Sequence, residues 1–227
     1  MPPDPNTVDG DDGSKVRLSR LLAGLEAMGI EANDNQVTLL LAYLRMLERW
    51  NKAYNLTAVR DGLQMINLHL LDSLSLHHHL TESNNIIDVG TGPGLPGIPL
   101  AVMNPDKNFT LLDSNGKKTR FIFQTINELK LSNAVEVNTR VELYRPQKRF
   151  DTIVTRAFSS LPDMLENCCH LASDQCYFMA MKGKNPESEL SLIKKDYKVS
   201  DICRLTVPGV DGERHLVKIK NIASIHN

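Results

Sequence analysis

The residues of this sequence best suited to chemistry are an acid and the glycines that follow it. Asp88 ends a short apolar run at residues 85–89. Four glycines follow at alternate and third positions: Gly90, Gly92, Gly94 and Gly97. This order predicts a buried strand that turns sharply into a helix, because glycine takes backbone angles that side chains forbid. Such a turn allows a small-molecule cofactor to lie directly on the main chain.

The glycine spacing alone fits two kinds of cofactor. Gly92, Gly94 and Gly97 match the G-x-G-x-x-G of dinucleotide sites. Asp88 with the first three glycines matches the acid-x-G-x-G-x-G typical of S-adenosylmethionine (SAM) sites. Asp113, at the end of the next apolar run, stands where a β-α-β unit places an acceptor for ribose hydroxyls, which NAD and SAM both carry. The plainer alternative, two acids that only cap helices, is disfavoured because all parts occur in the order that the motif requires.

A helical region precedes this turn. Apolar residues at helical spacing predict helices from Val16 to Met28, from Asp34, as the N-cap, to Trp50, and from about Leu63 to Leu80. The first 15 residues are rich in proline and aspartate and predict a disordered tail. Three consecutive histidines at 77–79 would point about 100° apart on a helix, so we expect no metal site.

After Glu82 the pattern changes to alternating strands and helices. We expect strands at 85–89, 108–113, 134–138, 151–155, 176–182, about 200–207 and 215–220. Helices are expected near 95–103, 117–130, 140–145, 160–171 and 186–195. Residues 208–212 are too few for a crossover helix, so the last two strands must pair antiparallel.

These patterns predict three parts: a disordered tail at 1–15, a helical region at 16–81 and a Rossmann-like SAM-binding domain at 82–227. The sheet that we expect is seven-stranded and mostly parallel with an antiparallel last strand. That is the class I SAM-dependent methyltransferase fold, in the α/β class. The NAD fold needs a second mononucleotide-binding half after the fourth strand, and none follows residues 150–158. The cofactor is therefore expected to be SAM.

The composition predicts the class of the protein and its cellular location. The 227 residues are 41% hydrophobic and 23% charged, as in soluble globular proteins. No apolar run approaches the roughly 20 residues that cross a bilayer, and no signal peptide is apparent, so we expect a cytoplasmic protein without membrane attachment. The four cysteines form no C-x-x-C pair, which predicts reduced core residues. A net charge of −1 means that any nucleic-acid contact needs a local basic patch.

The sequence also limits the acceptor chemistry. No Asp-Pro-Pro-Tyr-like run, the usual device for an exocyclic amine, follows the fourth predicted strand. No Pro-Cys nucleophile for carbon methylation occurs there either. What remains is an acceptor atom with its own lone pair, for which no general base is required.

Taken together, seven motifs resemble the ribosomal RNA small subunit methyltransferase G family, also known as the glucose-inhibited division protein B family. They are WNKAYNLT at 50–57, HLLDS at 69–73, DVGTGPGLPGIPL at 88–100, LDS at 112–114 with Lys117, Lys118 and Arg120, RVE at 140–142, TRAF at 155–158 and DGERH at 211–215. The resemblance covers about residues 16–221. It implies SAM-dependent methylation of N7 of one guanine in the decoding-region loop of 16S rRNA.

The resemblance also implies site residues. Gly90 and Leu95 would contact SAM from the turn, Val141 and Glu142 its adenine end, and Arg156 would lie beside its methionine end. The spacing argument adds Asp88, Gly92, Gly94 and Asp113 to the cofactor site. The partner would be 16S rRNA or the small ribosomal subunit, and we expect a monomer.

Guanine N7 is unprotonated at neutral pH, so catalysis would be chiefly alignment and removal of water. We expect no classical catalytic base, and Arg156 and Asn51 are the candidates for orienting groups. Because a cation close to N7 would oppose the reaction, Arg156 is expected to hold a carboxylate or a phosphate. Contacts to RNA are expected from Lys52, Tyr54, Arg60, Lys117, Lys118, Arg120, Lys182 and Lys184. Asn51 could instead simply fix its own loop, and Tyr54 or Phe158 could stack on an extruded base or pack in the core.

Two other functions stay open from sequence. One is a SAM-dependent methyltransferase that acts on a small molecule or a protein. The other is a non-catalytic RNA-binding assembly factor of the same fold, against which the intact glycine turn argues.

Overall fold

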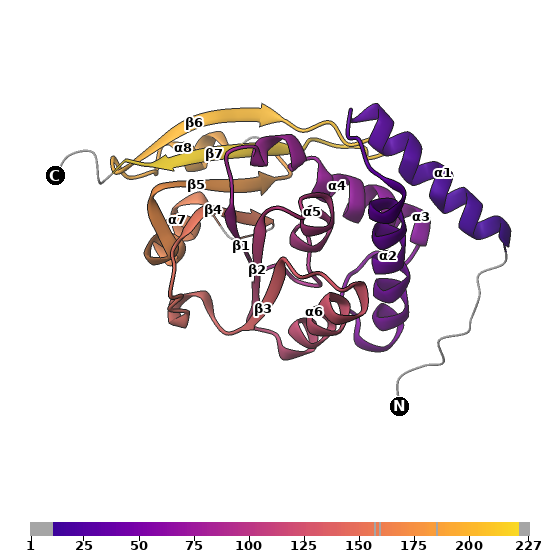
Figure 1. The fold of residues 1–227 in the computed structure, drawn as a ribbon. Coiled ribbons are helices and arrows are strands. Elements are labelled where there is room, and N and C mark those ends of the chain that lie inside the picture. The colour runs from indigo at the N-terminus through magenta and orange to yellow at the C-terminus, as the bar shows by residue number, and fades with distance from the viewer. Residues whose placement is uncertain (1–10, 157, 159, 185, 223–227) are drawn as a thin grey trace.

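The computed structural model describes residues 11–156, 158, 160–184 and 186–222 (Figure 1). The first helix, α1 (Asp11–Ala27), begins earlier than the predicted Val16, so the tail predicted at 1–15 is wrong for its last residues. The rest of that tail, residues 1–10, lies outside the described residues. In the described part of the chain, no helix is both long and apolar enough to cross a bilayer.

The second helix, α2 (Asp34–Tyr54), is capped by Asn33 and not by the predicted Asp34. The Asn33 side chain accepts the N–H of Gln36 at 2.9 Å, and the Gln36 side chain accepts the N–H of Asn33 at 3.0 Å. This reciprocal capping box satisfies two backbone donors that a helix start leaves without partners.

The single helix predicted over 63–80 is instead built from four consecutive segments. These are α3 (Gly62–Met65), the π-helix η1 (Ile66–Leu71), α4 (Asp72–Leu74) and the 3₁₀-helix η2 (His77–Leu80). The backbone N–H of Asp72 donates to the carbonyl of Asn67, five residues earlier. A π-helical turn holds more residues than an α-turn and so changes the direction of the side chains that follow. Apolar spacing does not distinguish the two turn types.

The sheet has seven strands in the order β3-β2-β1-β4-β5-β7-β6. Their bounds are β1 (Asn85–Val89), β2 (Asn108–Asp113), β3 (Ala134–Asn138), β4 (Phe150–Arg156), β5 (Ala172–Lys182), β6 (Tyr197–Arg204) and β7 (His215–Asn221). The first five strands pair in parallel, and β7 pairs antiparallel with both β5 and β6. The predicted mostly parallel sheet with an antiparallel last strand is confirmed.

The helices between the strands differ more from expectation. They are α5 (Gly97–Met103), α6 (Gly116–Leu129), η3 (Val141–Leu143), α7 (Leu161–Cys168), η4 (Cys169–Leu171) and α8 (Glu187–Leu190). The helix predicted at 186–195 is only the single turn α8, and the one at 140–145 is the 3₁₀ turn η3. Strand β5 begins four residues before the predicted 176, and β6 lies about three residues before the predicted 200–207.

Alternate strand residues supply two hydrophobic clusters, one on each face of the sheet. Ile86 and Leu111 belong to the cluster that also contains core residues of α1, α2, α5 and α6, whereas Ile87 and Leu112 pack with α7. This alternation follows from the period of two along a strand. Burial on both faces explains why the consecutive residues Ile86 and Ile87 of β1 are both apolar.

The helical region and the sheet share the larger cluster. Tyr43 of α2 is fully buried and donates its hydroxyl to the carbonyl of Pro93 in the glycine turn at 3.0 Å. Phe121 of α6 packs against Tyr43 and against Trp50, with ring centroids 6.2 and 5.6 Å apart. The division at residues 81 and 82 stays a prediction, because one core extends across it.

Phe121→Ala tests this shared core. We expect the substitution to lower the free energy of unfolding by about 3–5 kcal/mol, because it leaves a cavity between α2 and α6. Phe123→Ala is the matched control, since Phe123 lies on the same helix but is 52% exposed. Urea denaturation followed by circular dichroism should show one transition for both variants. Equal losses in the two variants, or a separate transition for the helical region, would contradict the shared core.

Candidate functional site

The turn after β1 takes the backbone conformation that its glycines predicted. Gly90 and Gly92 have φ angles of 70° and 63°, which L side chains rarely adopt. A side-chain atom added at either position would meet nothing within 4 Å, so both glycines face open space. The N–H groups of Gly90 and Thr91 both donate to the carbonyl of Leu112, at 2.8 and 3.1 Å, which ties the turn to β2.

The carboxylate of Asp88 stabilises this turn through hydrogen bonds. Its Oδ2 accepts the Thr91 hydroxyl at 2.6 Å and the N–H of Gly97 at 2.8 Å, so one oxygen fixes both ends of the turn. The other oxygen, Oδ1, is buried without a hydrogen-bond partner. Burial raises the pKa of Asp88 to about 6. A partnerless buried acceptor at this position suits a cationic group such as the ammonium of SAM.

The second predicted acid, Asp113 at the end of β2, also contacts the turn. Its Oδ2 accepts the N–H of Gly92 at 2.9 Å, and its Oδ1 accepts the N–H of Asn115 at 2.8 Å. Lys118 Nζ lies 3.8 Å from Oδ2. A carboxylate has about four lone-pair sites, so Asp113 retains acceptor capacity for a ribose hydroxyl.

A cavity of about 300 Å³ opens beside these acids. It is lined by Val89, Gly90, Leu112, Asp113, Ser114, Thr139, Arg140, Val141, Glu142 and Phe158. Four predicted cofactor residues, Gly90, Asp113, Val141 and Glu142, therefore lie together. Leu95 does not: its side chain is 2% exposed, in the core, and its N–H donates to the Thr91 carbonyl. Gly94 packs closely on Ile98.

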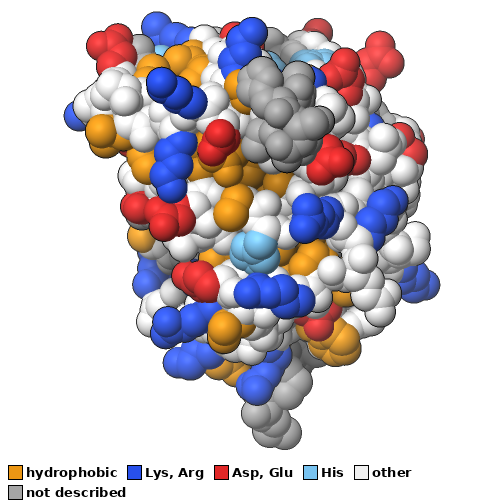
Figure 2. Space-filling view, turned by 90° about the vertical axis from the view of Figure 1, so that its left-hand side faces the viewer, with side chains coloured by type: hydrophobic (Ala, Val, Ile, Leu, Met, Phe, Trp, Pro, Cys, Tyr) orange, Lys and Arg blue, Asp and Glu red, His pale blue; other side chains and the backbone are white. Residues whose placement is uncertain are grey.

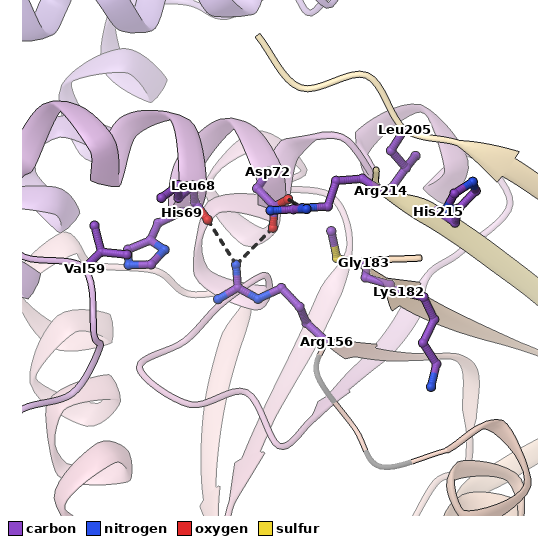
Figure 3. Close-up of a pocket in the computed structure, with 11 residues that line it drawn as sticks. Val59, Leu68, His69, Asp72, Arg156, Lys182, Gly183, Leu205, Arg214 and His215 are labelled. Atoms are coloured by element: carbon purple, nitrogen blue, oxygen red, sulfur yellow. Dashed lines mark hydrogen bonds and ion pairs between the residues drawn. The ribbon is translucent and has the colours of Figure 1, made fainter. Parts of the chain in front are cut away.

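A second cavity, of about 520 Å³, lies between the helical region and the carboxyl ends of β4 and β5 (Figure 3). Its lining residues are Val59, Leu68, His69, Asp72, Arg156, Met181, Lys182, Gly183, Leu205, Arg214 and His215. Arg156, predicted for the cofactor site, lies here. Phe158, two residues further along the chain, lines the first cavity instead.

Asp72 joins the charged groups of the second cavity. Its Oδ2 accepts Arg156 Nη1 and its Oδ1 accepts Arg214 Nε, each at 3.1 Å. Figure 3 shows the two guanidinium groups reaching Asp72 from different directions. Arg156 thus holds a carboxylate, which is one of the two groups expected for it. Sequence reasoning assigned no role to Asp72 or Arg214, although both lie in motifs quoted for the resemblance.

His69 lies across the same cavity from Lys182 and His215 (Figure 3). Its Nε2 is 2.9 Å from the Thr57 hydroxyl, and its Nδ1 is buried without a partner. Burial lowers the pKa of His69 to about 4, so the imidazole is neutral at physiological pH. His69 therefore adds a polar group but no charge to this cavity.

The other orienting candidate, Asn51, lines neither cavity. Asn51 is 2% exposed, its amide nitrogen donates to the Val59 carbonyl at 3.0 Å, and its oxygen accepts the N–H of Thr57 at 2.9 Å. Of the two alternatives stated for Asn51, the contacts match the one in which it fixes its own loop.

The predicted RNA-contacting residues fall into three groups. Lys52, Tyr54 and Arg60 are exposed at the end of α2 and in the loop after it, where Arg60 donates to Asn55 Oδ1. Lys117, Lys118 and Arg120 lie on the first turns of α6. Lys182 ends β5 and forms an ion pair with Glu189 at 2.9 Å, whereas Lys184 lies after the strand and is exposed.

The strand order, the antiparallel β7 and the acid-anchored glycine turn together define the class I SAM-dependent methyltransferase fold. Solved structures share it. A putative O-methyltransferase from Klebsiella pneumoniae has a TM-score of 0.57 and 13% identity, covering 87% of this chain and 93% of that one. A SAM-dependent methyltransferase from Aquifex aeolicus has a TM-score of 0.54 and 19% identity, covering 68% and 92%.

Sequence comparison places the chain more narrowly. The family model for rRNA small subunit methyltransferase G matches residues 36–217. The ribosomal RNA small subunit methyltransferase G of Escherichia coli O17:K52:H18 is 49% identical over 203 residues, which cover 89% of this chain and 98% of that relative. The protein of that name from Shigella boydii serotype 18 matches to the same extent. The chain belongs to the rRNA small subunit methyltransferase G family.

The raised pKa of Asp88 predicts how stability depends on pH. A carboxyl group whose pKa is higher in the folded state stabilises the fold below its unfolded pKa of 3.8, and that contribution is lost as the pH rises through about 6. Asp88→Asn cannot titrate. We expect the free energy of unfolding of the wild type, minus that of the variant, to fall by roughly 2.5 kcal/mol between pH 4 and pH 8. Urea denaturation at several pH values measures this difference, and a constant value would contradict the buried, partly unpaired carboxylate.

Proposed function

We propose that the protein transfers the methyl group of SAM to N7 of a specific guanine in the decoding-region loop of 16S rRNA. As a member of its family it is a SAM-dependent methyltransferase of small-subunit rRNA. The observation that carries the finer proposal is the pair of cavities at the carboxyl ends of the parallel strands. The first is lined by residues predicted for the cofactor, and the second, lined by Arg156 and Asp72, would take the acceptor base.

The residues of the first cavity fit SAM. Asp113 would accept the ribose hydroxyls, and Val141 and Glu142 would contact the adenine end. The partnerless oxygen of Asp88 would accept the ammonium of the methionine end, beside Arg156. When bound, SAM supplies a methyl group that its sulfonium makes electrophilic. The glycine turn keeps the main chain open for the ligand, since Gly90 and Gly92 carry no side chain.

Methyl transfer to the acceptor requires orientation and exclusion of water, and it requires no general base. Guanine N7 carries a lone pair at neutral pH, so no proton has to be removed before attack. The second cavity offers apolar groups from Val59, Leu68, Met181 and Leu205, which would exclude water from the base. Its polar groups, His69 and the cluster around Asp72, would fix the base within it.

The cations proposed to bind RNA lie on α2 and α6 and beside β5. Figure 2 shows the face at the left of Figure 1, where lysine, arginine, aspartate and glutamate side chains are interspersed. Helix α2 lies to the right in Figure 1, away from that face. We further propose that the protein acts as a monomer in the cytoplasm, with 16S rRNA or the small ribosomal subunit as its partner.

Transfer of label from methyl-tritiated SAM tests the function. Incubation with naked 16S rRNA and with small subunits that lack the modification should label one guanine, which nuclease mapping then locates in the decoding-region loop. The label should be released by the strand-cleavage chemistry that is specific for N7-methylguanine. Unlabelled RNA with labelled protein or metabolites would favour the alternative substrates, and RNA binding without any transfer would favour the assembly factor.

Lys117→Ala combined with Arg120→Ala tests the RNA-binding face. Both side chains are exposed on α6, and neither belongs to the lining of the two cavities described above. If both contact phosphates, RNA affinity should fall about 10-fold or more at physiological salt, and the dependence of affinity on salt should become shallower. SAM affinity, measured by calorimetry, should not change. Lys148→Ala with Arg149→Ala removes the same charge elsewhere and serves as the control. Unchanged RNA binding in the α6 variant would exclude this face.

A further inference from the structure

Asp72 and Arg214 are the charged residues of the second cavity to which sequence reasoning assigned no role. Asp72 is 5% exposed, and each of its oxygens accepts a hydrogen bond from a different arginine. Arg156 Nη1 also lies 3.4 Å from the carbonyl of Leu68. Such charge-assisted contacts are short and directional, so they hold the two guanidinium groups in defined positions.

These three residues come from distant parts of the chain. Asp72 follows the π-helix η1, Arg156 ends β4, and Arg214 precedes β7 (Figure 3). A further contact binds the same elements: Asn67 of η1 donates its amide to the carbonyl of Gly209, in the connection between β6 and β7, at 3.1 Å. Asp72 is therefore the point at which the helical region is joined to two sides of the cavity.

Asp72 also lowers the positive charge of the second cavity. Two guanidinium groups and one carboxylate carry a formal net charge of +1, whereas the arginines alone would carry +2. If the proposed function holds, positive charge leaves the sulfonium and appears on guanine during transfer. An unpaired cation beside that base would oppose this change, and pairing with Asp72 reduces the opposition.

We propose that Asp72 is a positioning residue for methyl transfer: it orients Arg156 and Arg214 at the acceptor cavity and halves their positive charge where the base becomes cationic. This inference rests on the proposed function. Asp72 acts through the two arginines and not by touching the reacting atoms. A residue that only tied helices to the sheet would affect folding and binding but would not affect the chemical step selectively.

Asp72→Asn separates these two roles. The variant keeps the size of the side chain but frees both arginines from a negative partner. We expect the single-turnover rate of methyl transfer, at saturating SAM and RNA, to fall on the order of 100-fold, because the orientation of the arginines is lost. RNA affinity should be unchanged or higher, since the cavity gains positive charge. Saturable SAM binding should persist in calorimetry.

Asp61→Asn is the matched control. Asp61 belongs to the same helical region, is exposed and caps α3 by accepting the N–H of Gln64 at 2.7 Å. Asparagine caps helices about as well as aspartate, so this variant makes the same change of charge without loss of structure. Its transfer rate and RNA affinity should match those of the wild type within about threefold. Both variants are compared in the full-length protein with small subunits or 16S rRNA as substrate.

Three outcomes would overturn the assignment of Asp72. They are a rate for Asp72→Asn within threefold of wild type, a fall in RNA binding in proportion to the fall in rate, and an equally slow Asp61→Asn. If Asp72→Asn does not fold, Asp72→Glu decides: it keeps the charge but lengthens the side chain, so transfer should be about 5- to 30-fold slower. Wild-type speed in Asp72→Glu would refute the positioning role. Absence of transfer by the wild type would refute the proposed function itself.

Discussion

The structure depends above all on one buried carboxylate. Asp88 is the penultimate residue of the central strand β1, and one of its oxygens fixes both the beginning and the end of the glycine turn. Removal of this charge from water is costly, and the raised pKa of Asp88 expresses that cost. These hydrogen bonds hold the backbone at Gly90 and Gly92 at positive φ angles, which residues with side chains rarely adopt. The turn is thus prepared for a ligand before any ligand binds, which reduces the entropy lost on binding.

The rest of the site follows from where parallel strands end. The carboxyl ends of β1 and β2 provide Val89 and Asp113 for one cavity, and those of β4 and β5 provide Arg156 and Met181 for the other. The helical region closes the second cavity, so it acts as a wall of the site as well as a covering for one face of the sheet. The end of β4 and the residues after it contribute to both cavities, since Arg156 lines the second and Phe158 lines the first.

Local patterns predicted the parts of this molecule whose structure is decided locally. The glycine turn, β1 and β2 were predictable because angles and alternation are encoded within a few residues. The one-turn α8 and the early start of β5 were not, since tertiary packing determines such boundaries. The cluster at Asp72 could not be derived from spacing, because its ion pairs join residues 84 and 142 positions apart in sequence. Leu95 was assigned to the cofactor site by the resemblance. Its side chain belongs to the core, and its contact with SAM stays a prediction.

A crystal structure of the complex with S-adenosylhomocysteine tests the central claim most directly. The account predicts that the ribose hydroxyls lie against Asp113, that the amino group lies against Asp88 Oδ1, and that the sulfur faces the cavity lined by Arg156 and His69. A nucleoside bound away from the glycine turn would contradict the account, as would a sulfur directed away from that cavity.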